Sequence, residues 1–254
     1  MFAEPLNPGG VVPNTHARAM SCRIVLGAIS LFARTTPVDA QSRPATLAAS
    51  AVVGIDHLIL GVDDLDRGMA EFARRTGVTP VKGGVHPGRG TQNALASLSD
   101  GRYLEILAPS HEAGVASDPR TSSATLTPVG WALHTSELRA VIAHMRSAGF
   151  VASEIRPGAR ARPDGVMLRW QTAAVSGAGL DDAPFFISWD ADTPHPSTQS
   201  PTGCRFGSAA MTEIDPAPLA KFLATVAVQV PVTRGTVPHM TIVLVCPKGS
   251  IAFR

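Results

Sequence analysis

Two side chains of types that bind metal ions, His57 and Glu105, lie inside apolar segments of the sequence. His57 is surrounded by isoleucine and leucine in GIDHLILGV, and Glu105 lies between leucine and isoleucine in YLEIL. An imidazole or a carboxylate buried in an apolar strand costs free energy unless it has a partner. Imidazole nitrogens and carboxylate oxygens together suit Zn²⁺, Fe²⁺, Mn²⁺ or Ni²⁺. The purely structural alternative is that His57 donates to a backbone carbonyl and Glu105 pairs with an arginine such as Arg89.

The elements that must position these two residues form a pattern that recurs along the chain. In its first copy a helix is expected over 63–77, because Asp63 or Asp64 can cap its start and Gly77 can end it. The alternation and the apolar content of the flanking segments predict strands at 52–62, 91–98 and 102–109.

A second copy of this pattern follows, and a third, weaker one runs from 205 to 254. In the second copy we expect a helix after residue 136, with Ser136 as its cap, and strands at 130–135, 165–173 and 184–190. His134 lies in the first strand of this copy, as His57 does in the first. Each copy has one helix and a mostly antiparallel sheet with an uncovered face, so two copies should pair. The fold class expected is therefore α+β, built from paired βαβββ modules.

A glycine-rich segment, GGVHPGRGTQNAL, precedes the strand expected at 91–98 and runs into it. Its glycines allow the backbone to approach a ligand closely. His86 could move a proton, and Arg89, Thr91 and Asn93 supply hydrogen-bond donors for a substrate. The alternative is a bulged loop whose polar groups cap one another. The segment lacks the GKS or GKT ending of a phosphate-binding loop, which argues against a nucleotide.

Two further groups in the second copy could act on a ligand. RPGARARPDG carries Arg156, Arg160 and Arg162, of which we expect Arg156 to lie in a solvated loop and Arg160 or Arg162 to reach a cleft. Arg162 is our candidate substrate-binding residue. His195 lies between two prolines in a rigid loop, where it either serves as acid or base or stays at the surface.

Composition excludes several classes of function. The chain has 254 residues, 44% of them hydrophobic and 17% charged, with a formal net charge of +2 and no basic cluster that would suit a nucleic acid. The three cysteines, Cys22, Cys204 and Cys246, show no zinc-binding spacing. We expect Cys204 and Cys246 to be buried thiols, with a bridge between them as the alternative. A small-molecule substrate is the expected partner, and a homodimer remains open.

The first 52 residues are expected to be a Pro-, Gly- and Ala-rich extension without a part in the fold. No apolar run reaches the length needed to span a bilayer. The expected location is cytoplasmic. The alternative is export through a signal segment that starts at Met20 and is cleaved after Ala40.

Several motifs, taken in order, resemble the glyoxalase-like group of the vicinal oxygen chelate superfamily. They are GIDHLILGVDDLDRG, GGVHPGRGTQNALASLSDGRYLEILAP, ARARPDGVMLRW, and PFFISWD followed by HP. The resemblance covers roughly residues 54–200. It implies modules 53–109 and 130–191 within one domain, 53–200, whose mixed, mostly antiparallel sheet curls around a cleft. A third βαββ unit, 201–254, would pack on that domain.

The resemblance also implies a divalent metal ion, Zn, Fe, Mn or Ni, held by strand residues. His57 and Glu105 take the ligand positions of the first module, and His134 that of the second module's first strand. The sequence departs from the family pattern in FFISWD, which offers Ile187 or Ser188 where a second carboxylate would stand. Three protein ligands are therefore expected at most.

Three functions remain in competition at this point. The first is a metal-dependent lyase, isomerase or dioxygenase acting on a small substrate with adjacent oxygens. The second is a metal-free protein that binds or sequesters a small molecule in the same cleft. The third is a non-catalytic unit in which residues 205–254 serve as a dimerisation or covering element. Fold alone does not separate them.

Overall fold

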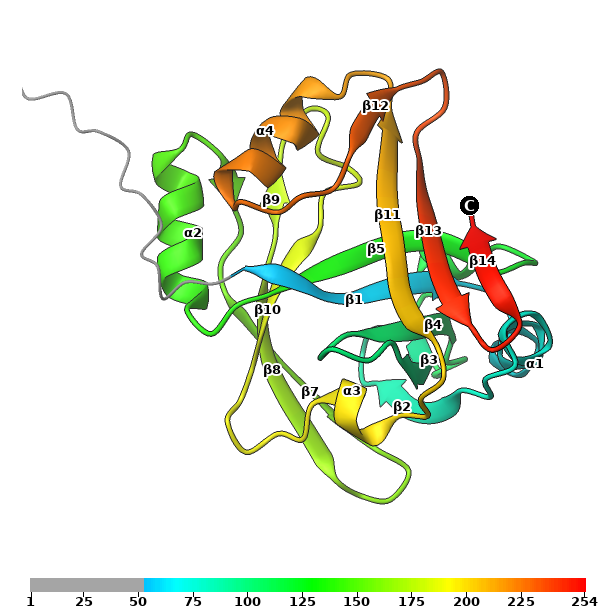
Figure 1. Ribbon diagram of the computed structural model, residues 1–254. Helices are drawn as coiled ribbons and strands as arrows, with labels where there is room; N and C mark the ends of the chain where they lie inside the picture. Colours follow the sequence, from blue (N-terminus) through cyan, green and yellow to red (C-terminus); the bar gives the residue numbers. More distant parts are fainter. Residues whose placement is uncertain (1–52) are drawn as a thin grey trace, which may run out of the picture. The chain divides into compact units, whose positions relative to one another are not determined.

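The first module runs from blue through cyan to green in Figure 1, a computed structural model that describes residues 53–254. Its elements are β1 Gly54–Gly61, α1 Leu65–Thr76, β2 Val81–His86, β3 Thr91–Ser97 and β4 Tyr103–Pro109. The Asp64 side chain accepts a hydrogen bond from Arg67 N and caps α1, and Gly77 ends the helix with a left-handed φ of 82°. Both ends of this helix were predicted correctly. The extension expected over residues 1–52 lies outside the described residues.

The second module repeats this order with additional short strands. Its elements are β5 Thr127–His134, α2 Leu138–Ser147, β6 Val151–Ala152, β7 Arg156–Ala161, β8 Met167–Ala173, β9 Val175–Ser176 and β10 Phe185–Trp189. A 3₁₀ helix, Pro119–Thr121, precedes it, and a short helix, α3 Pro196–Gln199, follows it. Two local predictions are wrong: α2 begins after Glu137 without a side-chain cap from Ser136, and Arg156 opens strand β7 instead of lying in a loop.

The two modules share one eight-stranded sheet in the order β2-β3-β4-β1-β5-β10-β8-β7. The antiparallel pair β1–β5 joins the modules, and each of these strands has a parallel neighbour in its own module, β4 and β10. The edge strands β2 and β7 contact each other, so the sheet curls into a nearly closed barrel. The α+β class with paired modules around a curled sheet is therefore confirmed.

Alternation along β1 and β4 separates the core from the cavity. His57 pairs with Tyr103, and Ile59 pairs with Glu105, so these four side chains share one face. The leucines and isoleucines between them point to the opposite face, where they join the hydrophobic core. The same strands thus bury an apolar face and present a polar one.

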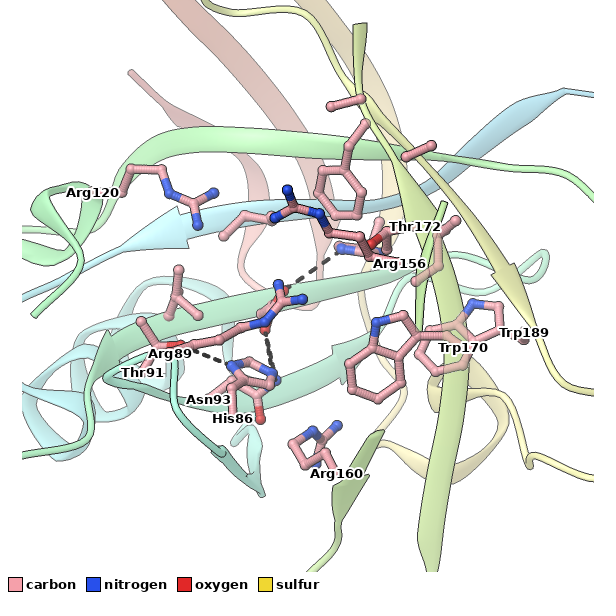
Figure 2. Close-up of a pocket in the computed structure, with 18 of the residues that line it drawn as sticks. His86, Arg89, Thr91, Asn93, Arg120, Arg156, Arg160, Trp170, Thr172 and Trp189 are labelled. Atoms are coloured by element: carbon pink, nitrogen blue, oxygen red, sulfur yellow. Dashed lines mark hydrogen bonds and ion pairs between the residues drawn. The ribbon is translucent and has the colours of Figure 1, made fainter. Parts of the chain in front are cut away.

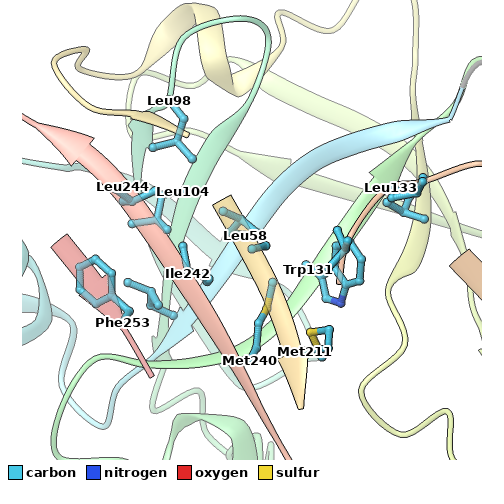
Figure 3. Close-up of a cluster of buried hydrophobic side chains, with 14 of the residues drawn as sticks. Leu58, Leu98, Leu104, Trp131, Leu133, Met211, Met240, Ile242, Leu244 and Phe253 are labelled. Carbon is cyan, nitrogen blue, oxygen red and sulfur yellow. The ribbon is translucent and has the colours of Figure 1, made fainter. Parts of the chain in front are cut away.

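The C-terminal segment forms a separate sheet in the order β12-β11-β13-β14 with one helix. Its elements are β11 Arg205–Glu213, α4 Ala217–Thr225, β12 Val232–Arg234, β13 His239–Cys246 and β14 Gly249–Phe253. Met211, Met240 and Ile242 are buried in the same cluster as Leu58 and Trp131 of the large sheet (Figure 3). The apolar segment MTIVLVC therefore covers the outer face of the first two modules.

A disulfide connects Cys204, just before β11, to Cys246 at the end of β13, with an S–S distance of 2.06 Å. The expectation of two buried thiols is wrong, and the alternative of a bridge holds. Both ends of the bridge are buried and lie within the C-terminal segment. No helix in residues 53–254 is long and apolar enough to cross a membrane.

Candidate functional site

A cavity of about 440 Å³ lies inside the curl of the large sheet and is lined by both modules (Figure 2). The first module contributes residues of β1–β4, and the second contributes residues of β7, β8 and β10. Its size is within the range of small-molecule sites. Apolar walls are formed by Ile59, Leu107, Trp170, Phe185 and Ile187.

His57 and Glu105 meet in this cavity as predicted. The distance from His57 Nε2 to Glu105 Oε2 is 3.6 Å, and only 3% of His57 is exposed. The imidazole stacks on Tyr103 with 4.5 Å between ring centroids. These contacts fix the plane of the ring and direct Nε2 toward the carboxylate.

Asp56 holds the other side of the His57 ring. Its carboxylate Oδ1 lies 2.6 Å from His57 Nδ1, and because an ionised carboxylate only accepts, Nδ1 donates. The pairing of β1 with β5 has an irregularity between Ile55 and His57, which lets neighbouring side chains depart from strict alternation. An imidazole whose single proton is on Nδ1 presents a lone pair at Nε2, which in His57 faces the cavity.

Asp56 is itself the centre of a buried polar cluster. Its second oxygen, Oδ2, accepts from Trp189 Nε1 at 3.1 Å and from His195 Nε2 at 3.2 Å, and His134 Nδ1 lies 3.6 Å away. Burial alone would raise the pKa of Asp56. The three histidines around it instead lower that pKa well below its usual range. Asp56 is therefore ionised and keeps His57 oriented.

The glycine-rich segment brings His86, Thr91 and Asn93 to the same carboxylate. Asn93 Nδ2 donates to Glu105 Oε1 at 2.6 Å and lies 3.3 Å from His86 Nε2. His86 Nε2 therefore accepts, and His86 Nδ1 donates to Thr91 Oγ1 at 2.9 Å. Burial lowers the pKa of His86 in spite of Glu105, so this histidine is held neutral.

Glu105 is thus surrounded by two imidazoles and an amide. Burial alone would raise its pKa, but His86 first, and then His57 and the Asn93 hydrogen bond, lower it. His86 Nε2 lies 3.7 Å from Glu105 Oε1, while His57 faces the other oxygen. The carboxylate is ionised and is available to a cation or a proton.

Several predicted site residues lie elsewhere. His134 is half exposed and does not line the cavity, because it pairs with Gly54 at the end of β1, whereas Ala132 stands opposite His57. The metal triad of His57, Glu105 and His134 is therefore not formed. Arg162 does not line this cavity either, and its guanidinium pairs with Asp164 at 2.7 Å.

His195 lies one layer behind the cavity. Its Nδ1 accepts from Ser197 N at 3.3 Å, and its ring packs on Tyr103 at 5.6 Å. It contacts Asp56 but does not line the cavity, so it supports the site instead of facing a ligand. Arg89, Thr91 and Asn93 do line the cavity as predicted.

Asp56 and Trp170 were not predicted from the sequence, and Arg160 was left undecided. Asp56 carries a usable signal, because a second polar residue directly before His57 in an apolar strand needs a partner of its own. Nothing in the sequence indicates that Trp189 would donate to that aspartate from 133 residues away.

The donor atoms around Glu105 lie slightly farther apart than the ligands of one metal ion. Two ligand atoms that share one ion at about 2.1 Å are about 3.0–3.5 Å apart. The separations of 3.6 and 3.7 Å around Glu105 are slightly wider. Within residues 53–254 no three His, Cys, Asp or Glu side chains are positioned to hold a metal ion as they stand. His57, Glu105 and His86 have suitable chemistry, and small shifts would bring them into range.

Comparisons with known proteins agree with this architecture. A hypothetical protein from Staphylococcus aureus superposes with a TM-score of 0.61 at 14% identity, covering 80% of this chain and 99% of that one. Methylmalonyl-CoA epimerase from Mycobacterium tuberculosis gives a TM-score of 0.40 at 23% identity, covering 57% of this chain and 91% of that one. The Streptomyces coelicolor methylmalonyl-CoA epimerase in complex with 2-nitronate-propionyl-CoA gives a TM-score of 0.42 at 20% identity, covering 56% of this chain and 100% of that one. Among curated proteins none matches the sequence.

The first of these similarities shows a shared fold, and the two epimerase scores are too low to say more. The model of one protein family, described as glyoxalase-like domain, matches residues 55–227, which is more than half of the chain. That range includes both modules and every residue that lines the cavity. The protein belongs to the glyoxalase-like domain family.

Proposed function

We propose that the cavity is the active site of a metal-dependent lyase, isomerase or dioxygenase that acts on a small substrate with adjacent oxygens. The observation that carries this proposal is the placing of two imidazole Nε2 atoms at the two oxygens of one buried carboxylate. These atoms belong to His57 and His86, at 3.6 and 3.7 Å from Glu105. Such a set of buried nitrogen and oxygen donors in a cavity is typical of sites that bind metals or transfer protons.

The three residues would hold the ion, which would supply a Lewis acid for a substrate oxygen. His57 would keep a fixed tautomer because Asp56 accepts from its Nδ1 at 2.6 Å. Glu105, ionised by its neighbours, would accept a proton from the substrate carbon next to the polarised oxygen. Phe185 and Trp170 would exclude water from the reacting atoms.

A metal-free binding function is supported by a different observation. Each of the three donors already has a protein partner: Asp56 for His57, Thr91 for His86, and Asn93 for Glu105. A satisfied polar network can position a ligand without an ion. In that case the cavity would sequester a small molecule and no turnover would occur.

Metal content per chain separates the two functions. The full chain is purified without chelator, incubated with Zn²⁺, Fe²⁺, Mn²⁺ or Ni²⁺, desalted and analysed by elemental analysis. We expect about one ion per chain in the wild type and in His239→Ala, whose histidine is exposed on β13. The ion should be lost when His57→Ala and Glu105→Ala are combined. A wild type that retains none of the four ions would rule out the metal-dependent mechanism and favour the binding function.

A further inference from the structure

Arg160 is a buried arginine that forms no direct ion pair, although the charge of Glu105 is near enough to favour the charged guanidinium. Only 3% of the residue is exposed, and it lines the cavity from β7 (Figure 2). Among the ion pairs of residues 53–254 none includes Arg160. A buried guanidinium that lacks a carboxylate partner is costly, so its presence needs a reason.

The guanidinium is held by one of its ends only. Arg160 Nη1 donates to the carbonyl oxygen of Gly83 on β2, across the contact between the two edge strands. Arg160 Nε is buried and has no hydrogen-bond partner in the described chain. The edge formed by Nε and Nη2 is therefore left free, and this edge can bind the two oxygens of one carboxylate.

Two glycines make this arrangement possible. A Cβ at Gly83 would collide with Asn93 Oδ1 and touch Arg160 Nη1, and Gly84 has a φ of 129° with the Ala161 carbonyl directly against it. Asn93 in turn donates to Glu105. The guanidinium of Arg160 thus lies, through its Nη1 end, close to Asn93, which contacts the carboxylate to which we assign the chemistry.

The charged residues that line the cavity carry a net positive charge, as Arg160 does. Four arginines line it, Arg89, Arg120, Arg156 and Arg160, whereas Glu105 is its only acidic lining residue in the described chain. Arg120 is neutralised by Asp118 at 2.7 Å. The walls between these charges are apolar, with Trp170, Phe185 and Ile187 among them.

We propose that Arg160 binds the carboxylate of a small 2-oxo or 2-hydroxy monocarboxylic acid, whose apolar body packs against Trp170 and Phe185. The second oxygen of such an acid, on the neighbouring carbon, would then face His57 and Glu105. Arg89 and Arg156, both exposed at the mouth, would attract the anion to the cavity. This inference names the substrate class of the proposed active site and depends on that proposal for the role of the second oxygen. Carboxylate binding itself requires no metal.

Isothermal titration of the full chain tests the proposal, with 2-oxo-4-methylpentanoate as the probe and its methyl ester as the uncharged match. We expect the acid to bind the wild type at least about tenfold more tightly than the ester, because a hydrogen-bonded charge pair is lost in the ester. Arg160→Gln should remove this preference. Arg169→Gln, on the adjacent strand β8 and outside the cavity, should keep it.

Arg160→Lys covers the case in which the glutamine variant unfolds. Lysine keeps the charge and can still donate to the Gly83 carbonyl, but it lacks the two-point edge, so the preference should fall several-fold without loss of thermal stability. Equal binding of acid and ester, an unchanged preference in a folded Arg160 variant, or no binding of the acid would each overturn the proposal.

The titration is repeated with chelator. Carboxylate binding that persists in metal-free protein would support this inference even if the metal-dependent mechanism fails. Metal binding without a preference for the acid would support the metal-dependent mechanism and contradict the carboxylate site.

Discussion

At the scale of single residues, the site depends on hydrogen bonds that fix which ring nitrogen carries the proton. Asp56 accepts from His57 Nδ1, and Asn93 donates toward His86 Nε2, so both imidazoles carry their proton on Nδ1. The first presents a lone pair at Nε2, and the second has that lone pair occupied. His57 is therefore better prepared than His86 to bind a cation or take a proton.

Asp56→Asn tests this arrangement through stability. The asparagine cannot be an ionised acceptor, and its amide group would face donors, so we expect the free energy of unfolding at pH 7 to fall by about 3 kcal/mol. Because the pKa of Asp56 is lowered by folding, its contribution is present above the unfolded value of 3.8 and is lost as the pH falls below it.

Denaturant unfolding of both proteins between pH 7 and pH 2 checks the sign. The wild type should lose stability toward low pH more steeply than Asp56→Asn, so that the two curves converge. A difference that is constant over this range would show that the ionised state of Asp56 does not matter.

The sequence predicts the first-module half of the site better than the second-module half. His57 and Glu105 were identified because each is a polar residue in an apolar strand, and the local pattern places both on one face. His134 was misplaced because its position depends on the register between β1 and β5, which pairs it with Gly54. Register across modules is set by packing and by an irregularity in β1, and neither is visible in a local pattern.

At the scale of elements, the seam where β2 meets β7 is shaped by glycine. Strands with bulky residues on both sides could not approach so closely, and Gly84 has its Cα directly beside the carbonyl of Ala161. The sequence predicted a ligand contact for this glycine-rich segment. Its glycines also have a packing role, since they let the side chain of Arg160 cross from one module to the other.

Gly84→Ala should therefore be destabilising for two reasons, an unfavourable φ of 129° and a collision with the Ala161 carbonyl. We expect a loss of about 3 kcal/mol in the free energy of unfolding. Gly88→Ala is the matched control, because Gly88 also has a positive φ, 70°, but has open space around it. That variant should lose only about 1 kcal/mol. Equal losses in denaturant titrations would contradict a close approach at the seam.

At the scale of the whole molecule, the C-terminal sheet completes the core of the large one. Trp131 and Leu58 would face water without Met211 and Ile242 above them. The strands of this segment were predicted from its apolar pattern, whereas the disulfide was only the alternative to two buried thiols. Cys204 and Cys246 are 42 residues apart, and only the antiparallel return of β13 along β11 brings them together.

The disulfide should contribute substantially to the stability of the whole protein. Closing a loop of this length is worth about 4 kcal/mol in the chain-entropy account. Reduction, or Cys204→Ser combined with Cys246→Ser, should lower the free energy of unfolding by about that amount in guanidinium titrations. Cys22→Ser serves as the control and should leave it unchanged. A reduced protein as stable as the oxidised one would assign the stability of the C-terminal segment to packing alone.

The contact between β2 and β7 also determines where the barrel can open locally. Among the described strands these two share no backbone ladder, and one side-chain hydrogen bond crosses between them. Local opening is easiest where few hydrogen bonds must break, so amide protons along β2 and β7 should exchange with solvent sooner than those of β1 and β5. A ligand could then enter through a transient opening between β2 and β7. The opening rate, measured as amide exchange under conditions in which every opening leads to exchange, would set an upper limit on the rate of entry by this route.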